Sequence, residues 1–177
     1  RCGPTTSEAA CADSIQWATS TNPYSGAGQA TVDLMVSSLG MRATRYESGQ
    51  RVNVDLRPGP RVDFGVATRP TVELALPEAY MIHQSTKAPN VEAVFAPKPT
   101  ILATLFTMLP AFLLRAAWFA AMMRLYFALV RRVVLSKFIS SVEMSVVARK
   151  GGREVRRRLQ APDGMSAGAW AIAATVQ

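Results

Sequence analysis

The amino-acid sequence predicts an α+β fold, with an antiparallel or mixed sheet and helices on one face. Residues 41–67 break into short runs separated by Gly- and Pro-containing turns, which is typical of antiparallel strands. Residues 101–130 form a long apolar segment that predicts helices. The chain has 177 residues, 49% of them hydrophobic and 18% charged. This length and composition fit one globular domain, so we expect residues 1–177 to form a single α+β domain.

The N-terminal region predicts little regular structure. Residues 1–24 are rich in Ser, Thr, Ala, Asn and Pro, with Trp17 as their largest apolar side chain, and they predict a weak helix followed by a loop. Between residues 28 and 39 the apolar side chains recur at helical spacing, and Gly40 stands where a left-handed helix cap is expected. We therefore expect a helix at the start of the 25–100 region.

The middle of the chain predicts a meander and a crossing helix. Val52, Val54 and Leu56 alternate with polar residues, which indicates a half-buried strand. Pro77 is suited to open a short helix that continues to Gln84. Residues 90–96 predict another strand, which the prolines that follow would end.

The apolar segment at 101–136 predicts helices that do not cross a membrane. A span needs about 20 apolar residues, but Arg115 follows only fourteen uncharged residues, and these include Pro110. We expect two apolar helices around residues 101–135, bent at Pro110. Trp118, Phe119, Met122 and Phe127 would face the protein core, a dimer partner, a bilayer surface or an apolar ligand.

The last part of the chain, residues 140–177, predicts a hairpin and a helix. Two strand patterns flank the Lys150-Gly151-Gly152-Arg153 turn. On the second strand, Glu154, Arg156 and Arg158 share one face, and Val155 and Leu159 share the other. Residues 165–176 predict a closing helix.

The charge distribution favours a lipid surface over a nucleic acid. The net charge is +8, and the basic residues gather in the last third of the chain beside the apolar segment. No aromatic residues are interleaved with them, as a single-strand binder would need. We therefore expect no nucleic-acid partner, although a merely solvated basic face remains the simplest alternative.

A glycine-containing loop precedes the first predicted helix. Gly26 and Gly28 match the first two glycines of a GxGxxG phosphate loop, but Thr31 replaces the third, and we expect no buried strand before the loop. The sequence therefore predicts no cofactor-binding residues. The alternatives are a glycine-rich start of a helix that approaches another ligand, and a plain helix cap.

The sequence contains no complete catalytic or metal-binding group. His83 is the only histidine, and it stands near Tyr80 and Gln84 at a predicted helix end. No nucleophile is paired with it by a recognised spacing, so we predict no catalytic residue and no metal site. Cys2 and Cys11 lie close together in sequence, and their redox state stays open.

Three stretches together resemble the C-terminal half of saccharopine dehydrogenase-like oxidoreductases. The first, residues 23–31, is similar to the loop and helix that open that half. The second comprises Val62-Asp63-Phe64-Gly65 and Pro89-Asn90-Val91-Glu92, and the third runs from Val155 to Gly164 with a Pro-Asp-Gly turn. Their order and spacing cover nearly the whole chain.

The resemblance implies one half of a two-part enzyme. An N-terminal Rossmann domain, which is missing from this chain, would bind NAD(P). The α+β half would bind substrate, pack beside the Rossmann domain and support a homodimer. The carried-over substrate-binding residues are Ser25, Gly26 and Gly28; Tyr80, His83 and Gln84 are added as the polar group on the predicted helix.

These expectations lead to one function and one alternative. The first is an oxidoreductase domain for an apolar or lipid-like substrate, inactive by itself and located in the cytoplasm. The alternative is a lipid- or membrane-surface-binding module without catalytic activity, peripheral at the membrane. The substrate and the choice between NADH and NADPH are not readable from the sequence.

Overall fold

The computed structural model describes residues 12–21, 29–134 and 142–161. They form an α+β fold with a mixed eight-stranded sheet, a separate two-stranded sheet and five helices. The α+β class predicted from the sequence is therefore confirmed. The predicted helix at residues 165–176 lies outside the described residues.

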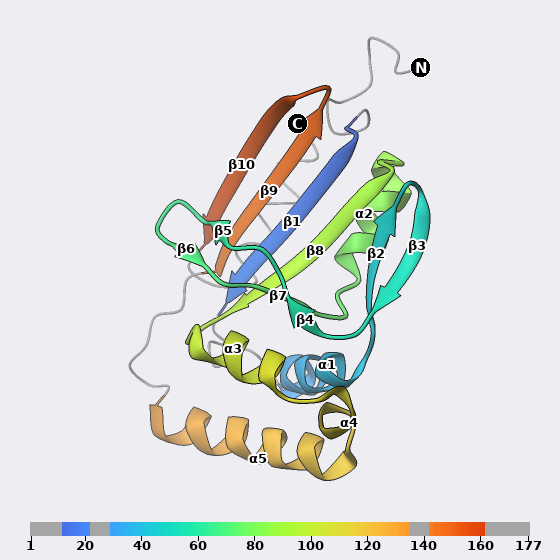
Figure 1. The fold of residues 1–177 in the computed structure, drawn as a ribbon. Coiled ribbons are helices and arrows are strands. Elements are labelled where there is room, and N and C mark those ends of the chain that lie inside the picture. Colours follow the sequence, from blue (N-terminus) through green and yellow to red (C-terminus); the bar gives the residue numbers. More distant parts are fainter. Residues whose placement is uncertain (1–11, 22–28, 135–141, 162–177) are drawn as a thin grey trace.

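The main sheet is built around two parallel strands (Figure 1). β1 (Ser14–Thr21) pairs in parallel with β8 (Asn90–Pro97), and all other pairs are antiparallel. On one side of this pair follow β9 (Val142–Lys150) and β10 (Arg153–Ala161). On the other side β8 is flanked by β2 (Ala43–Glu47), with β3 (Gln50–Val54) beyond it, and by β7 (Val72–Glu73), with β4 (Arg57–Pro58) beyond it.

The prediction of a weak helix and loop for residues 1–24 is wrong for Ser14–Thr21, and so is the expectation that no buried strand precedes the glycine-containing loop. This segment is the strand β1, which has paired neighbours on both sides. Ile15 is 4% exposed and Ala18 is fully buried, because both faces of the strand are covered. Its many small polar residues concealed the alternation of Ile15, Trp17 and Thr19, which is the period of a strand.

The meander predicted for residues 41–67 is confirmed in its first part. β2 and β3 form an antiparallel hairpin closed by a turn in which Ser48 and Gly49 have positive φ. The rest consists of two-residue strands. β5 (Val62–Asp63) pairs with β6 (Thr68–Arg69) in the separate small sheet.

Different elements cover the two faces of the main sheet. On one face, Ile15, Val91 and Ala93 pack against Ala79 and Ile82 of α2 (Glu78–Thr86). Pro77 stands directly before α2, as the sequence predicted. On the opposite face, Val62 and Phe64 pack against Ala18, Val94 and Ala96.

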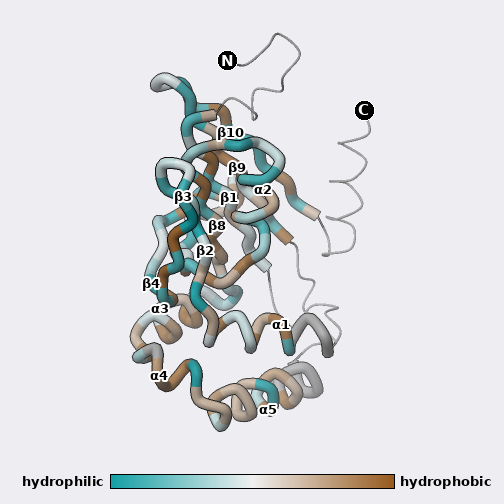
Figure 2. Tube along the Cα trace, turned by 90° about the vertical axis from the view of Figure 1, so that its right-hand side faces the viewer, coloured by the Kyte–Doolittle hydropathy of each residue, from teal (hydrophilic) through white to brown (hydrophobic). Residues whose placement is uncertain are grey.

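The other helices form a layer across one end of the main sheet (Figures 1 and 2). They are α1 (Gln29–Gly40), α3 (Ile101–Met108), α4 (Ala111–Leu114) and α5 (Ala117–Val134). Their core joins Leu39 of α1, Phe106 of α3, and Phe119, Met123 and Phe127 of α5 to Phe95 of β8. The prediction of helices on one face of the sheet therefore holds for α2, whereas the apolar helices mainly cover the end of the sheet.

The predicted break at Pro110 is confirmed, although three helices replace the expected pair. Leu109 is extended, with φ −81° and ψ 130°, because the ring of a following proline disfavours helical backbone. The short helix α4 then connects α3 to α5. None of the described helices combines the length and the hydropathy that a membrane span requires.

The C-terminal hairpin is formed as predicted. β9 and β10 pair over their whole length, and Gly151 and Gly152 turn the chain with φ values of 53° and 83°. Two consecutive residues with positive φ match the right-handed twist of the two strands.

Candidate polar groove on the sheet

A polar groove lies on the face of the main sheet opposite α2. Gln16 of β1, Glu92 of β8 and Arg149 of β9 line two neighbouring hollows of about 600 and 240 Å³, which we together call the polar groove. Gln16 and Glu92 are partners in the parallel register, and the Gln16 amide donates a hydrogen bond of 3.0 Å to Glu92 Oε2. The floor of the groove is therefore held by adjacent strands of the sheet.

The walls of the groove come from the small sheet, from β10 and β2, and from the first residues of β1 and β8. The larger hollow is bounded by Arg61, Asp63 and Thr68 around the small sheet and by Arg156 of β10. The smaller hollow is bounded by residues of β1, β2 and β8: Ser14, Arg45, Glu47 and Asn90. Each hollow thus offers both cationic donors and carboxylate acceptors.

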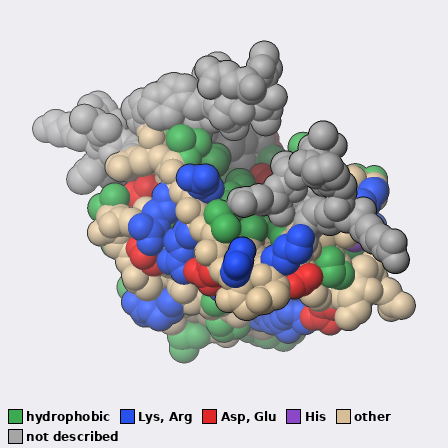
Figure 3. All heavy atoms as spheres, turned by 90° about the horizontal axis from the view of Figure 1, so that it is seen from above, with side chains coloured by type: hydrophobic (Ala, Val, Ile, Leu, Met, Phe, Trp, Pro, Cys, Tyr) green, Lys and Arg blue, Asp and Glu red, His purple; other side chains and the backbone are tan. Residues whose placement is uncertain are grey.

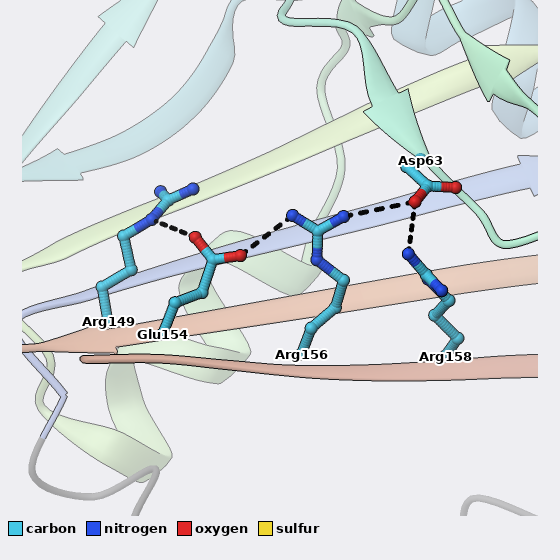
Figure 4. A network of polar contacts seen from close by, with 5 residues as sticks. All are labelled: Asp63, Arg149, Glu154, Arg156 and Arg158. Atoms are coloured by element: carbon cyan, nitrogen blue, oxygen red, sulfur yellow. Dashed lines mark hydrogen bonds and ion pairs between the residues drawn. The ribbon is translucent and has the colours of Figure 1, made fainter.

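A chain of ion pairs crosses the β9–β10 side of the groove (Figure 4). Glu154 accepts hydrogen bonds of 2.9 Å from Arg149 and from Arg156. Arg156 also lies 3.5 Å from Asp63, which binds Arg158. The hydrogen bonds from Arg156 and Arg149 hold the pKa of Glu154 below its ordinary value. This carboxylate therefore stays charged at neutral pH and orients the two arginines.

A buried ion cluster lies further along the same face. Glu143 of β9 is bound by Lys98 at 2.7 Å and by Arg69 at 3.3 Å, and its side chain is only 3% exposed. Burial raises the pKa of this carboxyl, but the hydrogen bond and charge of Lys98, together with Arg69, outweigh burial and lower the pKa. Glu143 is therefore an anchored structural anion beside the groove.

The end of the sheet that carries the β9–β10 turn shows interleaved charges. In Figure 3, basic and acidic side chains alternate over this end, with apolar side chains between them. A ligand at this end would therefore meet cations and carboxylates side by side.

The predicted substrate residues lie away from this groove or outside the described residues. Ser25, Gly26 and Gly28 belong to residues 22–28, which the structure does not describe. Tyr80, His83 and Gln84 lie on α2, which covers the opposite face of the sheet. The structure thus places Tyr80, His83 and Gln84 on one helix, and their role in binding substrate stays a prediction.

His83 makes contacts that fix its ring. The ring stacks on Tyr46 at a centroid distance of 3.7 Å, and Nδ1 donates a hydrogen bond of 2.9 Å to the carbonyl oxygen of Ala88. Tyr80 is 51% exposed, and the side-chain oxygen of Gln84 accepts a hydrogen bond from Lys87. In this arrangement His83 tethers the end of α2 to β2.

Sequence reasoning missed the groove because it missed β1. Gln16 belonged to the segment predicted as a weak helix and a loop. Glu92 and Arg149 were assigned to strands, but nothing in the sequence placed these two strands on either side of residues 14–21. The only available signal was the period of two along residues 14–21, which places Gln16 on the face opposite Ile15 and Trp17.

The groove is equipped for binding and orientation. Among the described residues, no three His, Cys, Asp or Glu side chains are grouped so that they could hold a metal ion. The groove-lining residues are arginines, carboxylates, amides and hydroxyls, which recognise polar groups through charge-assisted hydrogen bonds. No family model and no curated protein matches the chain.

Proposed function

We propose that this chain is the C-terminal substrate-binding and dimerisation domain of a saccharopine dehydrogenase-like NAD(P)-dependent oxidoreductase that acts on an apolar or lipid-like substrate. One observation carries the proposal: two of the stretches that resemble this family contribute side chains to the polar groove. Asp63 and Glu92 come from the second stretch, and Arg156 comes from the third. Segments far apart in sequence thus meet where a substrate would bind.

The proposal assigns different tasks to the two halves of the enzyme. NAD(P) would be held by a Rossmann domain and would supply the hydride chemistry. The groove would bind the polar end of the substrate through Gln16, Glu92 and Arg149, while the ion pairs around Glu154 keep the arginines in place. The sheet would thereby orient the substrate and exclude water in a cytoplasmic homodimer.

The first test is the DNA sequence upstream of the codon for Arg1, read over about 200 codons, roughly one domain. An in-frame strand–GxGxxG–helix pattern supports the proposal. A stop codon within a few codons contradicts it, because the NAD(P)-binding half would then be absent from the reading frame.

The groove is tested in the complete gene product. Arg149→Gln should lower kcat/KM for NAD(P)H-dependent turnover by about tenfold, because one charge-assisted hydrogen bond to substrate is lost. Arg51→Gln is the matched control, since Arg51 is an exposed arginine of β3 that does not line the groove. Equal activity of the two variants would exclude the groove as the substrate site.

A second candidate function is a membrane-surface module, which the exposed side of α5 favours. Phe119, Met123 and Phe127 form the buried stripe of this helix. A second apolar stripe recurs at helical spacing and faces solvent; we call it the outer stripe, and its residues are Trp118 (58% exposed), Met122 (47%), Leu125 (60%) and Leu129 (53%). An apolar stripe on a helix beside basic residues is typical of binding in the plane of an anionic membrane.

The charges around α5 agree with this second candidate. No Asp or Glu occurs between Glu92 and Glu143, whereas basic residues recur throughout this part of the sequence. Among the described residues, Arg124 binds Asp33 and Arg115 binds Asp55, so the carboxylates beside α4 and α5 come from other parts of the chain. An anionic lipid surface would therefore meet no repelling charge from this part of the sequence.

Sedimentation with vesicles of phosphatidylglycerol and phosphatidylcholine tests the second candidate. Met122→Glu should release the protein, whereas Met81→Glu should not, because Met81 is 62% exposed but lies on α2. Equal binding of both variants, or no binding by the unmodified protein, would contradict membrane attachment through the outer stripe.

A further inference from the structure

The two faces of the β9–β10 hairpin differ sharply in how their cations are paired. On the polar-groove face, Arg149, Arg156 and Arg158 are all bound by carboxylates. On the opposite face, Lys150, Arg153 and Arg157 have no acidic partner among the residues that the structure describes. Neutralisation is thus confined to one side of the hairpin.

The unpaired cations surround an apolar hollow of about 590 Å³. Its floor includes Val146, Ala148 and Val155, and Lys150, Arg153 and Arg157 also line it; we call it the basic-rimmed hollow. The volume falls within the range of about 300–1,000 Å³ that is usual for small-molecule sites. It lies on the face opposite the polar groove, because neighbouring residues of a strand point to opposite faces.

The strand register places the cations at both ends of the apolar floor. Lys150 is the cross-strand partner of Arg153, and Val155 is the partner of Ala148. One step further along, Arg157 is the partner of Val146. A ligand that covers the central apolar pair therefore has a cation within reach at either end.

Lys150 and Arg153 are also cross-strand partners of like charge, and a bound anion would relieve their repulsion. Like charges that face each other across two strands destabilise the pairing. No carboxylate of the described residues lies between them, in contrast to Arg149 and Glu154, which face each other in the next register position and form an ion pair. A bound anionic group would supply the missing countercharge.

We propose that the basic-rimmed hollow binds a single-chain anionic amphiphile, with the aliphatic tail on Val146, Ala148 and Val155 and the anionic head on Lys150, Arg153 or Arg157. The hollow combines the two properties that such a ligand needs, an apolar floor and unpaired cations at its edge. No aromatic side chain is among its described lining residues, which argues against stacked nucleic-acid bases. The inference goes beyond the proposed function: the hollow is a second site, on the face opposite the polar groove in which the substrate is proposed to bind.

Titration calorimetry of the intact protein with oleate, below its micelle concentration, tests the site. Arg157→Gln should weaken oleate binding by about tenfold, the value of one charge-assisted contact. Val155→Asp should abolish binding, because it places a carboxylate on the apolar floor. Arg61→Gln is the matched control, since Arg61 also has no acidic partner among the described residues but lies at the polar groove.

Oleyl alcohol separates the head from the tail. It should bind at least about tenfold more weakly than oleate, because it lacks the charge that the cations recognise. The proposal is overturned if oleate does not bind, if the alcohol binds as tightly, or if Arg61→Gln weakens binding as much as Arg157→Gln. If oleate binds but no Rossmann domain is encoded upstream, the amphiphile site is supported and only the proposed oxidoreductase function is contradicted.

Discussion

Glu143 lies near the start of β9, between Lys98 and Arg69. Its pKa is lowered in the folded protein, because these two cations outweigh the effect of burial. A carboxyl with a lowered folded pKa stabilises the fold above its unfolded pKa of about 4.3, and this contribution is lost as the pH falls through the lower folded value.

Glu143→Gln should therefore lower the free energy of unfolding at neutral pH by about 2 kcal/mol, because two partly buried cations lose their countercharge. The difference from the unmodified protein should shrink as the pH falls below about 4. Urea denaturation at several pH values measures it. Glu154→Gln is the control and should have a much smaller effect, since its ion pairs are exposed. A pH-independent difference for Glu143→Gln would contradict the charge argument.

Gly59 lies too close to Thr71 for any side chain. A Cβ atom at position 59 would stand 2.4 Å from Thr71 Oγ1, which is held by a hydrogen bond of 2.6 Å to the Pro60 carbonyl oxygen. Gly59→Ala should destabilise the protein by about 1–3 kcal/mol, the usual effect of overpacking. In a Thr71→Ala background the same substitution should cost less, because the hydroxyl is gone. Thermal unfolding of the four proteins tests this, and simple additivity would exclude the contact as the cause.

The β9–β10 hairpin depends on its two-glycine turn. Gly151 and Gly152 both have positive φ, and a Cβ at either position would meet no atom within 4 Å. Any effect of substitution must therefore come from the backbone. Gly152→Val should cost about 1–2 kcal/mol, whereas Gly151→Asn should be nearly neutral, because Asn tolerates this conformation. Chemical denaturation measures the free energy of unfolding of each variant. Equal losses for both variants would contradict the explanation by backbone conformation.

The helix α5 illustrates where sequence patterns become ambiguous. Its apolar residues predicted a helix correctly, but they occupy two stripes, and sequence alone could not say which one is buried. Phe119, Met123 and Phe127 are buried because α1 and the end of the sheet cover them. Trp118 and Met122 are exposed, so they do not face the core, and the other expected environments, a dimer partner, a bilayer surface or an apolar ligand, stay predictions for them.

The position of β1 makes the whole fold depend on the N-terminal part of the chain. β1 is hydrogen-bonded to both β8 and β9, and β9 and β10 reach the rest of the main sheet only through it among the described residues. A chain that begins after Thr21 should therefore fail to unfold cooperatively. Hydrogen exchange should show β8 and β9 unprotected; retained protection in both strands would contradict the central role of β1.

The sequence determined the elements whose signals are local. Hydrophobic periodicity, Pro77, Pro110 and the two-glycine turn predicted α1, α2, the break before α4 and the C-terminal hairpin, because backbone preferences and turn conformations depend on adjacent residues. These elements were also enough to predict the α+β class.

Only the tertiary structure decided which strands are neighbours and which faces meet ligands. Pairing of β1 with β8 joins residues 14–21 to residues 90–97, and no local signal specifies such a distant partner. The polar groove and the basic-rimmed hollow both follow from that pairing and from the β9–β10 register. A ligand site on a sheet consists of side chains that are remote in sequence, so it exists only after long-range pairing has brought them together.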